Sequence, residues 1–132
     1  MPTPPVWYAG QDWTAADAEE ITPGAWQALS LLNGWTNRTG QVAAQIRMVN
    51  SVAVEVVGTI TAGTVTAGTV LFDVPTGFAP QNDQIFPAVE WQTANGQAPL
   101  VVQPGPPGNV IILNAVTAGC SLSFGFTYWL DC

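Results

Sequence analysis

Short runs of β-branched and aromatic residues, separated by turn-forming residues about every ten positions, constrain the fold of this chain most strongly. In the last run, residues 121–130, large apolar residues at the even positions alternate with small, polar or aromatic ones. Such alternation places one set of side chains on each face of a strand. The runs that we predict to be strands are residues 42–49, 52–60, 69–74, 85–92, 99–102, 109–113 and 121–130. About eight short strands predict an all-β fold, an antiparallel, jelly-roll-like β-sandwich.

Glycine and proline add local expectations within these runs. Gly58 lies inside the run 52–60, where a glycine indicates a bulge or a close approach of another backbone. Pro87 lies inside the run 85–92 and indicates an edge or bulge position, because proline donates no ladder hydrogen bond. The segments 50–51 and 75–77 are typical of turns.

The first 24 residues have a different character. Residues 1 to about 11 are rich in proline and then interrupted by glycine, and they predict an extended arm. Residues 12–21 predict one short helix, with Thr14 as its N-cap and Asp17 at the capping-box position. We therefore divide the chain into residues 1–24, an arm and helix that dock or tether the protein, and residues 25–132, a β-sandwich head domain.

The charge of the chain excludes several classes of function. Nine acidic residues face two arginines, with no lysine or histidine, for a net charge of -7. Binding to nucleic acid or to an anionic membrane surface needs far more positive charge. No apolar run is long enough for membrane insertion, and no secretory signal is evident, so we expect synthesis in the cytoplasm. Charged residues make up only 8% of the chain, against about 25% in typical domains, which favours contact between copies.

The residues needed for common catalytic chemistry are missing. Without histidine or lysine the usual nucleophile–base arrangements cannot form, and Glu55, Asp73 and Glu90 lie on different predicted strands. We therefore expect a non-enzymatic protein with no cofactor and no metal site. Cys120 and Cys132 are expected to be two separate small apolar side chains, and a disulfide between them is the alternative.

Aromatic residues are the remaining candidates for a binding role. The chain has six tryptophans, and exposed Trp and Tyr side chains stack on sugars and anchor interfaces. The candidate contact residues are Trp7, Tyr8, Trp91 and Trp129. Trp129 lies on the opposite face of its predicted strand from Tyr128, so it is expected to point away from the core. Packing in the core or between subunits is the alternative role for these rings.

The order of several motifs resembles a known family. The motifs are Leu-Leu-Asn-Gly-Trp-Thr-Asn at 31–37, Val-Leu-Phe-Asp-Val-Pro-Thr-Gly-Phe-Ala-Pro at 70–80, a late strand at 109–114 and Val-Thr-Ala-Gly at 116–119. Together they resemble the C-terminal β-sandwich head domain of minor tail proteins and tail-tip knobs of tailed phages, especially phages of actinobacterial hosts. The resemblance implies a homotrimeric knob on the virion, joined to other virion proteins through its N-terminal arm and contacting host-surface glycans.

Two alternatives stay open beside the tail knob. In that family the head usually ends a long fibre, whereas these 132 residues contain neither a coiled coil nor a collagen-like repeat. A capsid decoration protein, held by its N-terminal arm, is the first alternative, and a carbohydrate-binding module is the second. Trp91 and Trp129 gathered on a free surface would favour glycan binding, and the same residues between subunits would favour a purely structural role.

Overall fold

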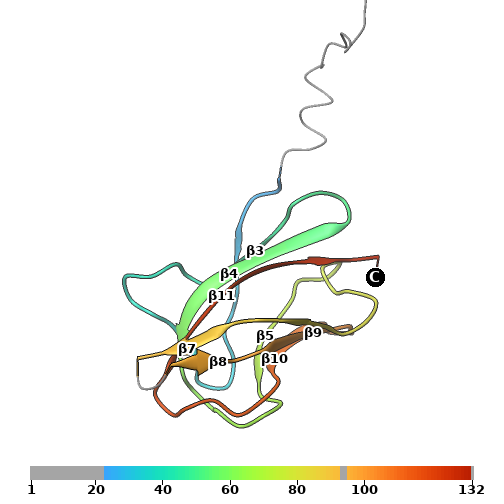
Figure 1. Cartoon of the computed structure of the whole chain (residues 1–132). Coiled ribbons are helices and arrows are strands. Elements are labelled where there is room, and N and C mark those ends of the chain that lie inside the picture. Colours follow the sequence, from blue (N-terminus) through green and yellow to red (C-terminus); the bar gives the residue numbers. More distant parts are fainter. Residues whose placement is uncertain (1–22, 93–94, 132) are drawn as a thin grey trace, which may run out of the picture.

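The computed structural model describes residues 23–92 and 95–131, which form an all-β domain without a helix (Figure 1). None of the described residues belongs to a helix that could cross a membrane. The strands are β1 Gln27–Ala28, β2 Thr36–Asn37, β3 Gln45–Met48, β4 Ala53–Thr61, β5 Val70–Asp73, β6 Gln84–Phe86, β7 Val89–Trp91, β8 Gly96–Gln97, β9 Leu100–Gln103, β10 Asn109–Ile112 and β11 Ser121–Trp129.

The strands form two antiparallel sheets, consistent with the predicted sandwich. The larger sheet has the order β1-β3-β4-β11-β7-β8, with β2 also paired to β4, and the smaller sheet has the order β5-β10-β9-β6. The pair β4–β11 is the longest in the larger sheet, and its register runs without a break from Thr61↔Ser121 to Ala53↔Trp129. In Figure 1 β3, β4 and β11 of the larger sheet lie above β5, β9 and β10 of the smaller sheet.

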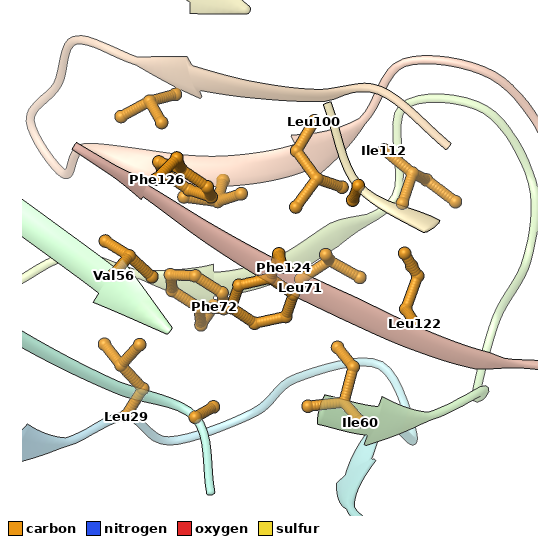
Figure 2. Close-up of a cluster of buried hydrophobic side chains, with 14 of the residues drawn as sticks. Leu29, Val56, Ile60, Leu71, Phe72, Leu100, Ile112, Leu122, Phe124 and Phe126 are labelled. Carbon is orange, nitrogen blue, oxygen red and sulfur yellow. The ribbon is translucent and has the colours of Figure 1, made fainter. Parts of the chain in front are cut away.

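One hydrophobic core fills the space between the sheets. The even-numbered residues of β11 from Leu122 to Tyr128 are buried, as their alternation predicts, and they meet the inner side chains of β4 and of the smaller sheet (Figure 2). Phe126 stacks on Phe86 of the smaller sheet with ring centroids 4.6 Å apart. Burying each large apolar side chain stabilises the fold by about 1.5–3 kcal/mol, so this layer holds the two sheets together.

The predicted strand over residues 85–92 proves to be two strands in different sheets. β6 pairs with β9 of the smaller sheet, whereas β7 pairs with β11 of the larger one. The chain crosses between the layers at Pro87 and Ala88, where a residue without an N–H group costs no ladder hydrogen bond. The prediction of an edge or bulge position for Pro87 therefore marked where the strand is interrupted, but it did not show that the chain changes sheets there.

Other expectations have mixed outcomes. The predicted turn at 50–51 is present, and Asn50 Oδ1 accepts a hydrogen bond of 2.8 Å from the Val52 amide. Three strands of two residues each, β1, β2 and β8, were not predicted. The predicted arm (residues 1 to about 11) and helix (12–21) lie outside the described residues, so the proposed division at residue 24 stays a prediction.

The loops gather at two ends of the domain. At one end, which we call the proline end, loops 74–83 and 104–108 meet, and the Val74 amide donates to the Gly108 carbonyl over 2.9 Å. The end of β11 lies there too, on the side where Figure 1 marks the C-terminus. At the opposite end, loops 62–69 and 113–120 meet, and Val116 donates to the Val65 carbonyl over 3.0 Å.

Candidate functional site

Trp129 lies on the outer face of the larger sheet at the proline end, as predicted. Its side chain is 47% exposed. Its main chain is held by one side chain of β6: Gln84 Nε2 donates to the Trp129 carbonyl over 2.8 Å, and the Trp129 amide donates to Gln84 Oε1 over 3.4 Å. The ring is therefore presented to solvent from a fixed backbone.

Trp91 is half-buried, and its polar group is already used within its own sheet. The indole Nε1 donates to Ser123 Oγ over 2.8 Å, and Ser123 Oγ lies 3.0 Å from the Thr59 hydroxyl. The guanidinium of Arg38 lies 4.8 Å from the centre of the Trp91 ring and donates to Ser121 Oγ over 3.0 Å. One face of the ring and its N–H group are thus satisfied internally, which makes Trp91 a poor sugar platform.

Trp91 and Trp129 share one face but do not form a cluster. The register places Trp91 opposite Ser121, at the start of β11, whereas Trp129 is the last residue of that strand. Eight residues at about 3.4 Å each separate the two positions by roughly 27 Å. The glycan-binding cluster considered from the sequence is therefore not assembled within one chain. Trp7 and Tyr8 lie outside the described residues, and their contact role stays a prediction.

Both arginines of the chain pack against tryptophan, which sequence reasoning missed. Arg47 forms an ion pair with Glu55 at 2.8 Å, and its guanidinium lies 4.3 Å from the centre of the Trp26 ring. Arg38 occupies the corresponding position over Trp91. No spacing in the sequence brings Arg38 near Trp91, because the contact depends on the pairing of distant strands. On the outer face of the larger sheet, the charge of Arg47 is thus neutralised by an ion pair, and both guanidinium groups lie over tryptophan rings.

The middle of this outer face is apolar and hollowed. A shallow groove of about 430 Å³ runs between Val42, Val57, Val89 and Gly125. Val42 and Val89 are more than half exposed, although they are large aliphatic residues. Apolar side chains that stay exposed beside a groove are typical of protein–protein contact surfaces.

A second groove, of about 460 Å³, lies at the proline end between segments 74–81 and 104–108. In the first segment the Phe78 amide donates to the Pro75 carbonyl over 3.0 Å, and Gly77 at the third position of this turn has φ = 89°. A positive φ at that position is the geometry of a type II turn and favours glycine. Buried Tyr128 donates its hydroxyl to the Phe78 carbonyl over 2.6 Å, which ties the turn to the core.

Cysteine chemistry and metal binding have little support among the described residues. Cys120 is fully buried, and burial raises the pKa of its thiol, with negative Glu90 nearby raising that pKa further. A buried thiol with a raised pKa is a poor nucleophile. Cys132 lies outside the described residues, so its pairing with Cys120 stays a prediction. Within residues 23–92 and 95–131 no group of three acidic, cysteine or histidine side chains could hold a metal.

Comparison with known proteins gives a clear result for the fold alone. No family model matches the chain, and no curated protein matches it significantly. The receptor binding protein gp15 of Listeria phage PSA has a similar structure, with 19% identity and a TM-score of 0.66 over 89% of this chain and 73% of that one. The head domain of lactococcal phage bIL170, described among receptor binding domains, is also similar, with 17% identity and a TM-score of 0.58 over 81% and 98%. The chain thus has the fold of phage receptor-binding head domains.

Proposed function

We propose that this chain is the head domain of a tailed-phage receptor-binding protein, carried on the virion tail as a homotrimer and contacting host-surface glycans. The likeness of its fold to two phage receptor-binding head domains carries the proposal. The chemistry of the described residues agrees with a binding role, because they offer grooves and an exposed aromatic ring rather than a nucleophile with its base.

The middle of the outer face of the larger sheet, around the groove between Val42, Val57 and Val89, is the surface that we propose for contact between subunits. It combines exposed Val42 and Val89 with a shallow groove, and Arg47 neutralises Glu55 on the same face. A chain with a net charge of -7 repels its copies, so an apolar face with paired charges is where copies meet at least cost. Light scattering is expected to give three times the 13.9 kDa of one chain, and a monomer at every concentration would contradict the trimer.

The position of the protein in the virion separates the tail role from capsid decoration. Gold-labelled antibody against the chain is expected to mark the tail tip of phage particles that contain it. Labelling distributed over the capsid shell would overturn the tail assignment and favour the decoration protein. In parallel, fluorescent full-length chain should label bacterial cells saturably, in competition with unlabelled chain, if the protein binds a receptor.

Replacing Trp129 with alanine is expected to weaken this cell labelling at least tenfold while leaving stability within about 0.5 kcal/mol. The ring is half exposed, so its loss removes contact area for a ligand without opening a cavity in the core. Leu113→Ala, at a comparably exposed residue near the opposite end, is the matched control and should label cells like the unaltered chain. Equal labelling by both variants would remove Trp129 from the contact surface.

A further inference from the structure

Hydrogen bonds hold the loops that form the groove at the proline end. Hydrogen bonds join its two segments to each other and to the core, through Val74 to Gly108 and through Tyr128 to Phe78. The segments also approach closely, because a Cβ atom on Gly108 would lie 2.6 Å from Ala79 Cβ and 2.8 Å from Val74 Cγ2. A groove of about 460 Å³ falls within the usual range for ligand sites, and its fixed loops lower the entropy cost of binding.

The main chain of the groove has fewer donors than acceptors, and its side chains carry no charge. Five of its twelve lining residues are prolines, which have a carbonyl acceptor but no N–H donor, although the Pro75 carbonyl already accepts from the Phe78 amide. Thr76 and Gln81 supply the polar side chains, and none of the twelve residues is charged. The pyrrolidine rings of the prolines add apolar surface to the lining. A matching ligand therefore donates hydrogen bonds from several hydroxyl groups and also presents C–H surface.

This chemistry discriminates among ligand classes. An anionic ligand would find no cation, because Arg47 is paired with Glu55 and Arg38 lies at the opposite end, stacked on Trp91. An extended proline-rich peptide requires an aromatic-lined groove, and this lining contains no aromatic residue. A neutral saccharide fits both requirements, since its hydroxyl groups donate to carbonyl oxygens and its ring presents apolar C–H edges.

We infer that the groove between segments 74–81 and 104–108 is a binding site for a neutral saccharide. This inference rests on the proposed receptor-binding function and gives it a location. Trp129 lies at the same end of the domain, connected to the groove through segment 81–84.

The site is tested by saturation-transfer NMR on the full chain with defined probes. The neutral probes are lactose, maltose and N,N′-diacetylchitobiose, and the anionic probe is glycerol 3-phosphate. Thr76→Trp and Gln81→Trp place a large ring at exposed lining positions and should fill the groove without disturbing the core. Asn82→Trp, in the same loop but outside the lining, and Thr66→Trp, at the opposite end, are the matched controls.

We expect transfer from at least one neutral disaccharide, with affinity reduced at least tenfold in both groove variants and retained in both controls. Transfer from glycerol 3-phosphate alone, or undiminished transfer in the groove variants, would overturn the site. Cell labelling distinguishes this inference from the function on which it rests. Labelling that persists in the groove variants, or that occurs without any saccharide transfer, removes the site and leaves receptor binding standing. No labelling by the unaltered chain on any cell tested removes receptor binding itself.

Discussion

Replacing Gly58 with valine is expected to destabilise the domain by about 2–3 kcal/mol, enough to unfold a large share of the molecules in a marginally stable domain. A Cβ atom at Gly58 would lie 2.7 Å from the Ala44 Cα atom and 3.0 Å from Phe124 Cζ. The first of these neighbours is backbone, which cannot rotate away as a side chain can. To make room for the new side chain, the backbone at Ala44 must move away from β4, and this movement disturbs the core packing beside it.

Gly96→Val is the matched control for this substitution. Gly96 also lies in a strand, β8, opposite Glu90, but a Cβ atom there would meet only Glu90 Cγ, at 3.9 Å. Urea unfolding of both variants measures the difference, and we expect the Gly96 variant to stay within about 0.5 kcal/mol of the unaltered chain. Equal losses in the two variants would show that the close approach at Gly58 is not what limits stability.

Stability is expected to fall above about pH 10 at up to about 1.4 kcal/mol per pH unit, because of Tyr128. Burial raises the pKa of this phenol above its ordinary value of 10.0, so the folded chain holds the proton more tightly than the unfolded chain does. The contribution is fully present below the unfolded pKa and is lost as the pH rises toward the folded one. Thermal unfolding measured from pH 7 to pH 11 follows this loss.

The Tyr128→Phe variant isolates that contribution, since both chains keep Cys120, whose buried thiol is also shifted upward. At pH 7 the variant should be less stable by about 1–3 kcal/mol, because the Phe78 carbonyl loses the hydroxyl that donates to it over 2.6 Å. At pH 11 the stabilities of the two chains should converge, because residue 128 can lose a proton only in the chain that has tyrosine there. A stability difference that stays constant across this pH range would contradict the buried hydrogen bond.

The parts of the fold that were predictable from sequence depend on local pattern. The alternation in β11 placed Tyr128 in the core and Trp129 outside it, and the isolated glycine in β4 marked a close backbone approach. The split of the predicted strand 85–92 was not predictable, because it depends on which distant strand each half pairs with. Strands of two residues have no period to detect and were missed for that reason.

The candidate site shows the same division. The exposure of Trp129 follows from its position in one strand, whereas the role of Trp91 depends on Arg38, Ser121 and Ser123, which belong to other segments. The groove at the proline end is assembled from two loops about thirty residues apart. The turn at 75–77 was visible in the sequence, but the meeting of its loop with segment 104–108 depends on the pairing of strands in the smaller sheet.

The contact between Gln84 and Trp129 covers main-chain groups at an open edge of the larger sheet. Among the described residues, no strand pairs with β11 beyond Ser123 on the side of β7, so the second half of β11 is an open edge. Open edges recruit strands from other molecules and lead to uncontrolled polymerisation. The Gln84 amide binds both main-chain groups of Trp129 and acts as a one-residue substitute for the missing strand. At the end of this edge, the main-chain groups of Trp129 are therefore already bonded and are not offered to a strand of another molecule.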